Sequence, residues 1–208
     1  MDAVILHEDR DIVVCVKPVG TLSEKGGMPE ILAQSCAAKE IYTVHRLDRA
    51  VGGVMVYAKT AAAAAKLSAA MGAGDFKKQY QAVVHGRPAE DSGVMRDMLF
   101  KDSAKNKSYV VKRMRKGVKE AELEYSVIES RADMSLVKIT LHTGRSHQIR
   151  VQFSSRKMPL VGDVKYGSSR KDCNIALWSA SLAFTHPKSG ERMCFSANPP
   201  EVYPWTEF

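Results

Sequence analysis

Residues 52–71, GGVMVYAKTAAAAAKLSAAM, predict a strand that leads directly into a helix. The stretch 52–59 reads as the strand because apolar, β-branched and aromatic residues dominate it. Thr60 is a suitable N-cap for an alanine-rich helix that runs to Met71, and the glycines that follow favour its end. Since alanine side chains are small, we expect this helix to pack closely on a sheet.

Apolar stretches on both sides of this segment predict further strands. Near the N-terminus, residues 4–6 and 12–16 are expected to form two strands joined at the charged turn EDRD. After the helix, FKKQYQAVVHG predicts a strand that places Tyr80 on the same face as two small apolar residues.

The second half of the chain continues the β pattern and adds one short helix. YVVKRM, AELEYSVIE and SLVKITL predict strands, and the C-terminal region predicts two more around the turn HPKSGE. HTGRSHQIRVQFSSR predicts a helix with Ser146 as its N-cap. Ile149 and Phe153 share one face of this helix, whereas His147 and Arg150 share another, so Arg150 is left to point away from the apolar anchor.

These elements predict the α+β class, with a mixed, mostly antiparallel sheet flanked by a few helices and loops. A chain of 208 residues that is 45% hydrophobic can bury one good core or two modest ones. No repeat or low-complexity linker divides it. We therefore expect a single domain over residues 1–208, with or without two lobes.

The chain is basic, with 31 Lys and Arg against 23 Asp and Glu, a net charge of +8 and a pI near 9.3. This balance favours an anionic partner such as nucleic acid or a membrane surface, although a merely soluble basic protein would show the same charge. From Lys101 to Lys119, eight basic residues and one acid are interleaved with apolar residues. That segment suits a strand or loop along a phosphate backbone, and the alternative is a solvated face.

Several classes of protein are excluded by what the sequence lacks. The four cysteines lie far apart and no His pair has metal spacing, so neither a metal site nor a disulfide framework is expected. Glycine-rich nucleotide motifs, H-E-x-x-H and the zinc deaminase pattern are absent. No signal peptide and no apolar run of membrane-spanning length is present, which predicts a cytoplasmic protein.

One carboxylate stands in a basic segment, HRLDRA at residues 45–50. Asp48 lies between Arg46 and Arg49 and follows His45 closely. A structural ion pair would account for this pattern by itself. A carboxylate that acts as nucleophile or base must instead stay ionised beneath a substrate, and an arginine partner would keep it charged.

Four motifs, taken in order, resemble those of the RluA-type pseudouridine synthases, which isomerise specific uridines in ribosomal or transfer RNA. VHRLDRAVGGVMVYAKT resembles the H-R-L-D segment, KKQYQAVVHG the second motif, LHTGRSHQIRVQF the third, and PLVGDVKYG the stretch that follows. EDRDIVVCVKPVGTLS also resembles the N-terminal strand pair of that family. The likeness runs from about residue 4 to about residue 197 and implies one catalytic domain with its active site in a basic cleft and no separate N-terminal RNA-binding domain.

The resemblance implies catalytic roles for three residues. Asp48 would attack a carbon of the target uridine or remove a ribose proton. Tyr80 would stack on the base and help to remove the C5 proton, and Arg150 would pair with Asp48. No cofactor is implied, because the reaction is an isomerisation, and the protein would act as a monomer.

The partner implied by the resemblance is RNA, either ribosomal or transfer RNA. Arg46 would fill the space left by the flipped nucleotide or grip a phosphate. The residues expected to contact RNA are Arg46, Arg49, Lys77, Lys78, Arg145, His147, Lys112 and Arg113.

Alternatives remain for these roles. Tyr80 could be a core aromatic, Arg150 could contact phosphate, and His45, His147 and Lys77 suit loop-shaping or backbone contacts better than chemistry. The chain could also be a non-catalytic RNA-binding protein or chaperone on the same scaffold. A glycosylase, a third hypothesis, would release free uracil.

The sequence departs from the family pattern at three places. Where the family usually has Thr-Ser-Gly after H-R-L-D, this chain has the run 50–53, AVGG, which removes two hydroxyls from the loop. Gln152 and Trp178 occupy positions that are commonly histidine. These departures bear on the rigidity of the loop and on the identity of the substrate more than on the type of reaction.

Overall fold

The computed structural model describes residues 3–208, which fall into two compact units. The first unit holds residues 3–78 and Trp178–Pro199, and the second holds Gln79–Leu177 and Pro200–Phe208. The chain thus passes from the first unit to the second and back, and it ends in the second. The prediction of a single domain over residues 1–208 stays a prediction.

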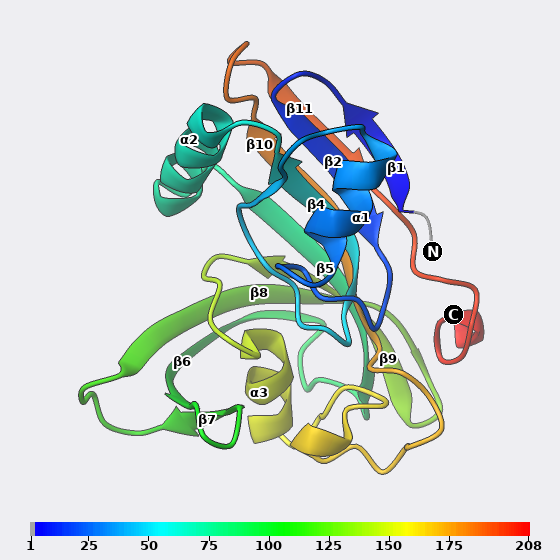
Figure 1. The fold of residues 1–208 in the computed structure, drawn as a ribbon. Helices are drawn as coiled ribbons and strands as arrows, with labels where there is room; N and C mark the ends of the chain where they lie inside the picture. Colours follow the sequence, from blue (N-terminus) through cyan, green and yellow to red (C-terminus); the bar gives the residue numbers. More distant parts are fainter. Residues whose placement is uncertain (1–2) are drawn as a thin grey trace. The chain divides into compact units, whose positions relative to one another are not determined.

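The first unit is a sheet with two helices (Figure 1). Its strands are β1 (Val4–Glu8), β2 (Ile12–Lys17), β3 (Tyr42–Thr43), β4 (Gly52–Ala58), β10 (Leu177–Thr185) and β11 (Arg192–Ser196). They follow the order β1-β2-β4-β10, with β3 paired to β4 and β11 paired to β10. All pairs in this unit are antiparallel except β4 with β10, which is parallel, so the C-terminal strands complete the N-terminal sheet.

The helices of the first unit are α1 (Met28–Ser35) and α2 (Ala61–Gly72). The predicted helix cap is confirmed: the Thr60 side chain accepts a hydrogen bond of 3.1 Å from the Ala63 amide. The strand pair predicted around EDRD is confirmed as well. Helix α1 was not predicted, because it is only eight residues long and holds a proline in its first turn.

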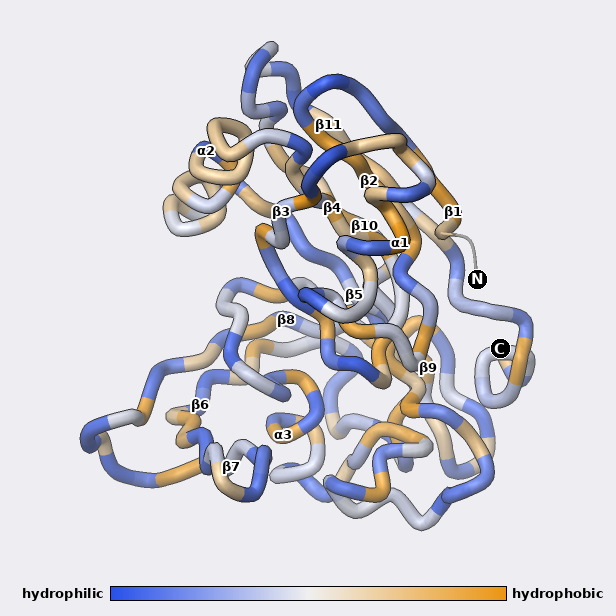
Figure 2. Tube along the Cα trace, viewed as in Figure 1, coloured by the Kyte–Doolittle hydropathy of each residue, from blue (hydrophilic) through white to orange (hydrophobic). Residues whose placement is uncertain are grey.

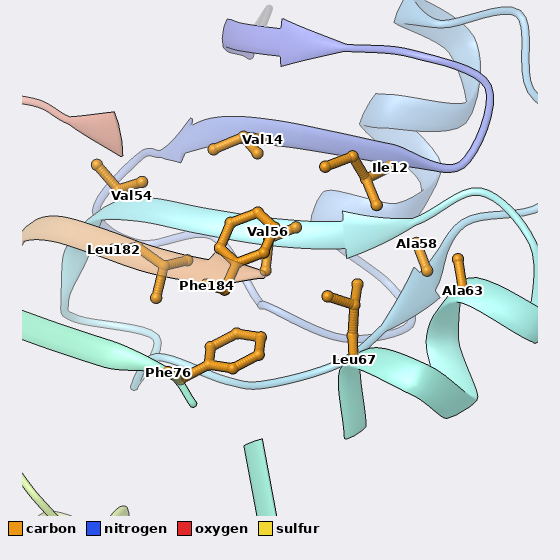
Figure 3. Close-up of a cluster of buried hydrophobic side chains, with 10 residues drawn as sticks. All are labelled: Ile12, Val14, Val54, Val56, Ala58, Ala63, Leu67, Phe76, Leu182 and Phe184. Carbon is orange, nitrogen blue, oxygen red and sulfur yellow. The ribbon is translucent and has the colours of Figure 1, made fainter. Parts of the chain in front are cut away.

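A hydrophobic cluster of the first unit lies between α2 and the strands. Strand β4 is buried at every position and β2 at five of six, which explains why both read as unbroken apolar runs. Figure 2 shows this hydrophobic character along β2. In Figure 3, Leu67 of α2 points toward Val56 on β4 and lies with Phe76 and Phe184 in one buried cluster.

The second unit is a curved, largely antiparallel sheet with one helix (Figure 1). Its strands follow the order β5-β9-β8-β6-β7: β5 (Lys77–His85), β6 (Ser92–Asp102), β7 (Lys107–Val111), β8 (Val118–Arg131) and β9 (Met134–Leu141). Helix α3 (Gln148–Ser155) and the single turns η1 (Val164–Tyr166) and η2 (Trp205–Glu207) complete it. Strand β6, rich in charged residues, was not predicted.

Together these elements confirm the α+β class with a mixed, mostly antiparallel arrangement of strands. One local prediction was wrong: Ser146 does not cap α3. The N-cap is His147, which has a left-handed φ of 53° and forms no side-chain cap. The Ser146 carbonyl instead accepts a hydrogen bond from Ser108 Oγ, and Gln148 Oε1 accepts one from the Arg145 amide. The N-cap thus lies one residue later than predicted, because the chain passes through a left-handed residue before the helix begins.

Candidate active site

Asp48 lies in the loop between β3 and β4, and the backbone of this loop is held at several points. The Asp48 carbonyl accepts a 2.9 Å hydrogen bond from the Val51 amide, which closes a tight turn. The amide of Leu47 donates to Ser23 Oγ, which donates back to the Leu47 carbonyl. Asp48 itself is partly exposed. The loop thus fixes the backbone on both sides of the carboxylate.

His45 anchors the start of this loop. It is buried, and its Nε2 accepts a hydrogen bond of 3.2 Å from the Val56 amide on β4. Burial, with the nearby positive charge of Lys78, lowers the pKa of His45 to about 3. The ring is therefore neutral at physiological pH, which supports the loop-shaping role rather than acid–base chemistry.

A buried lysine that sequence reasoning missed supports the same loop. Lys17, at the end of β2, is fully buried, and its Nζ donates to the carbonyls of Pro18, Thr21 and Arg49 at 3.0, 2.8 and 3.3 Å. Burial lowers its pKa to about 8, while the negative charge of Asp48 acts in the opposite direction. The signal in the sequence was a lysine that ends an otherwise apolar strand just before a proline.

The two arginines of the loop are exposed. Arg46 pairs with Glu24 at 2.9 Å, and both side chains are more than half exposed. Arg49 Nε donates to the Gly20 carbonyl, while the Gly20 amide donates to the Arg49 carbonyl, each at 2.8 Å. Arg49 therefore joins two loops through its backbone and its side chain, whereas Arg46 extends into solvent.

Arg150 lies on α3 in the second unit and is buried. Its Nε and Nη2 donate to the two carboxylate oxygens of Asp163 at 2.6 and 2.9 Å. The guanidinium also lies over the ring of Tyr166, 5.0 Å from the ring centroid. The motif PLVGDVKYG contains Asp163 and Tyr166, but the sequence predicted no role for either residue. The predicted pairing of Arg150 with Asp48 stays a prediction.

Tyr80 lies on β5 with 7% of its surface exposed. Ala82 and Val84, predicted on the same face, are fully buried, and so is Val83 between them. The strand is held at this end because the Val83 amide donates to the Ala176 carbonyl. Tyr80 therefore lies on a strand whose buried residues are concentrated in its second half.

A comparison with known proteins identifies the class. The family model described as RNA pseudouridylate synthase matches residues 11–155, a span that contains the Asp48 loop, β5 and α3. The chain belongs to the RNA pseudouridylate synthase family. The synthase is accordingly an isomerase, and the resemblance drawn from its motifs is confirmed.

Curated relatives agree with this assignment. The dual-specificity RNA pseudouridine synthase RluA of Escherichia coli K12 is 34% identical over 93% of this chain and 92% of that protein. The ribosomal large subunit pseudouridine synthase D of Zymomonas mobilis is 31% identical over 95% of this chain and 69% of that protein.

Solved structures confirm the fold of the synthase. The human RNA pseudouridylate synthase domain containing 4 superposes with a TM-score of 0.82 and 22% identity, over 98% of this chain and 91% of that one. The human RNA pseudouridylate synthase domain containing 1 gives the same TM-score and identity, over 97% and 85% of the two chains. The expected pseudouridine synthase fold is therefore correct.

The other residues predicted to contact RNA differ in their surroundings. Lys77, Lys112 and Arg113 are exposed, the last two between β7 and β8. Lys78 is less accessible: its Nζ lies 3.2 Å from Met71 Sδ, and burial lowers its pKa. RNA contact stays a prediction for each of them.

Two further predicted RNA contacts lie at the start of α3. His147 Nδ1 lies 2.9 Å from the Tyr166 hydroxyl, and Arg145 Nε donates to the Glu120 carbonyl at 2.8 Å. The synthase thus gathers Arg145, His147 and Arg150 at one helix start. RNA contact by Arg145 and His147 also stays a prediction.

The departures from the family pattern have structural counterparts. A Cβ atom on Gly52 would lie 2.4 Å from a ring carbon of Trp178, and Trp178 Nε1 donates to the Ala197 carbonyl at 2.9 Å. The tryptophan therefore fills the space beside a residue that has no side chain. Gln152 is buried, and its Nε2 donates to the Met95 carbonyl and to Asp97. It ties α3 to β6.

Residues 3–208 hold no group of three or more His, Cys, Asp or Glu arranged to bind a metal ion. Within the same residues, no helix is long and apolar enough to cross a membrane. The chemistry that the described side chains offer is that of a carboxylate in a basic loop, a tyrosine on a covered strand and a buried arginine.

Proposed function

We propose that the synthase converts specific uridines in structured ribosomal or transfer RNA to pseudouridine, with Asp48 as the catalytic aspartate. The observation that carries this proposal is the family match over residues 11–155, which includes the Asp48 loop and the elements that bear Tyr80 and Arg150. The names of the relatives, one dual-specificity and one ribosomal, support the choice of RNA.

In the proposed reaction the bond between ribose C1′ and uracil N1 breaks, the uracil turns, and C5 bonds to C1′. The C5 proton is then lost and N1 gains a proton, so atoms and electrons balance without a redox partner or a group donor. Asp48 begins the reaction either by attacking a carbon of the uridine or by removing a ribose proton. The rigid backbone on both sides of Asp48 supports this role, because a reacting carboxylate must be held in position.

Tyr80 and Arg150 complete the proposed catalytic group. Tyr80 stacks on the base and helps to remove the C5 proton, and Arg150 keeps Asp48 charged. The resemblance to the family, rather than the geometry, brings these residues to one substrate. Exposed basic residues, among them Arg46, Lys112 and Arg113, then contact the RNA backbone. The protein is proposed to work as a cytoplasmic monomer without a cofactor.

The test is tritium release from RNA that carries tritium at uridine C5, with ribosomal and transfer RNA offered separately. Wild-type protein is expected to release tritium from at least one pool. Asp48→Asn, which keeps the shape of the side chain but not its charge, is expected to lower the rate by at least about 1,000-fold, as loss of an essential catalytic group does.

Asp91→Asn is the matched control, because Asp91 is an exposed carboxylate that pairs only at the surface with Arg87. It should release tritium at the wild-type rate. If wild type and Asp48→Asn bind RNA equally and neither releases tritium, the non-catalytic RNA-binding hypothesis is preferred. Free uracil in place of pseudouridine would indicate a glycosylase.

A further inference from the structure

Within the second unit, Arg150 is one member of a buried cluster with Asp163 and Tyr166. The Arg150 side chain is 6% exposed and the Asp163 side chain is fully buried. The two hydrogen bonds between them, at 2.6 and 2.9 Å, are of the planar, two-point kind that fixes orientation as well as distance. Tyr166 covers the guanidinium with its ring.

The loop that carries Asp163 is itself held in place. The Asp163 amide donates to the Leu160 carbonyl, and the Asp163 carbonyl accepts from the amides of Tyr166 and Ser168, all at 3.0 Å. The preceding Gly162 has φ +80°, and a Cβ there would lie 2.3 Å from the Asn174 carbonyl oxygen. Since the backbone on both sides of Asp163 has little freedom, its carboxylate is held in one position and can orient the Arg150 guanidinium.

Tyr166 is held from two other elements. Its hydroxyl accepts a 2.8 Å hydrogen bond from the Ser108 amide on β7 and lies 2.9 Å from His147 Nδ1 at the start of α3. Lys107, also on β7, lies over the same ring at 5.2 Å from the centroid. The ring that faces Arg150 is thus positioned by β7 and by the start of α3.

We propose that Asp163 and Tyr166 are positioning residues that fix the direction of the Arg150 guanidinium, and that Tyr166 ties this direction to strand β7. Arginine carries five N–H donors, and the two taken by Asp163 determine where the remaining three point. A buried ion pair adds little net stability compared with apolar packing, so orientation is the better reason for this one. The inference rests on the proposed function of Arg150.

The test measures the single-turnover rate of tritium release at saturating RNA, the dissociation constant of the RNA and the melting temperature of the protein. Asp163→Asn should lower the rate about 100-fold, because a small misplacement of a group at a reacting centre has an effect of this size. Tyr166→Phe keeps the ring but loses the hydroxyl, and should lower the rate about tenfold, as one lost hydrogen bond predicts. The dissociation constant should change less than about threefold, since neither residue is proposed to bind RNA.

Asp97→Asn is the control, because Asp97 pairs with Arg156 at the end of the same helix. It removes an Arg–Asp pair from α3 without touching Arg150, so its rate should stay near that of wild type. An equal loss of rate in Asp97→Asn and Asp163→Asn would mean that both merely loosen the helix, which overturns the inference.

A double-mutant cycle with Arg150→Lys separates positioning from general damage. Lysine keeps the charge but not the planar group. If Asp163 acts through Arg150, adding Asp163→Asn to Arg150→Lys should lower the rate little further, whereas multiplied effects would overturn the inference. If Asp163→Asn does not fold, Tyr166→Phe carries the same cycle.

Failure of this inference and failure of the proposed function can be told apart. No tritium release by wild type, or full release by Asp48→Asn, overturns the proposed function and the inference with it. Full release by Asp163→Asn and Tyr166→Phe, with wild type active and Asp48→Asn inactive, overturns the inference alone.

Discussion

The loop around Asp48 and the loop around Asp163 hold a carboxylate in opposite ways. Around Asp48 the supporting bonds from Lys17, Ser23 and His45 end on backbone groups, and the side chain is partly exposed. Asp163 is fully buried, and its carboxylate binds Arg150 directly. At Asp48 the backbone is held while the side chain stays accessible for a reaction. At Asp163 the side chain itself is held, which orients the guanidinium of Arg150.

The largest effect is expected from breaking the buried pair. Asp163→Ala leaves the Arg150 charge buried without this partner, and removing one member of such a pair costs about 4 kcal/mol of the free energy of unfolding. Urea denaturation measures this change. The same substitution at Asp97 also removes an acceptor of the Gln152 side chain, but its charged partner Arg156 is one-third exposed, so the loss of unfolding free energy should be clearly smaller. Equal losses would show that the depth of burial does not distinguish the two pairs.

A somewhat smaller effect is expected from the support beneath Asp48. Lys17→Met keeps the apolar stem of the side chain but removes the ammonium that donates to the carbonyls of Pro18, Thr21 and Arg49. The Pro18 and Arg49 carbonyls keep a backbone donor each. Loss of such partners should cost about 3 kcal/mol, measured by denaturation, and the tritium-release rate should fall because the loop is no longer held. Unchanged stability would show that water replaces the ammonium, and that Lys17 does not hold the Asp48 loop in place.

The contribution of Lys17 to the free energy of unfolding should also depend on pH. The pKa of Lys17 is lowered from 10.5 to about 8 in the folded protein, so between these values the unfolded chain binds more protons than the folded one. The contribution of Lys17 to stability therefore rises as pH increases from about 8 to 10.5. The difference in unfolding free energy between wild type and Lys17→Met should rise over this window, and a flat difference would contradict the burial of a charged amine.

The smallest effect concerns the end of the Asp48 loop. Gly52→Ala places a methyl group against the Trp178 ring and should cost about 2 kcal/mol by overpacking. Trp178→Leu should relieve the clash, so the double variant is expected to be more stable than the sum of the two single changes predicts. Strict additivity in thermal denaturation would show that the glycine and the tryptophan do not act together.

Much of the fold could be predicted from local patterns. The strand 52–58 and the helix that Thr60 caps follow from an apolar run and a capping residue, and both are observed. Strand β6 escaped prediction because charged residues interrupt its apolar pattern and its pairing with β8 supplies the stability that its composition does not. The cap at Ser146 was wrong because His147, in a left-handed backbone conformation, takes the N-cap position instead.

Some residues of the candidate site could also be predicted from the sequence, whereas others could not. The motifs in the sequence predict roles for Asp48, Tyr80 and Arg150 through their resemblance to those of the family. The burial of Lys17 and the pairing of Arg150 with Asp163 emerge only in the folded chain. A buried charge needs a hydrogen-bonding partner, and the packing of the surrounding elements determines which group lies close enough. The residues next to the charge in sequence do not determine that partner.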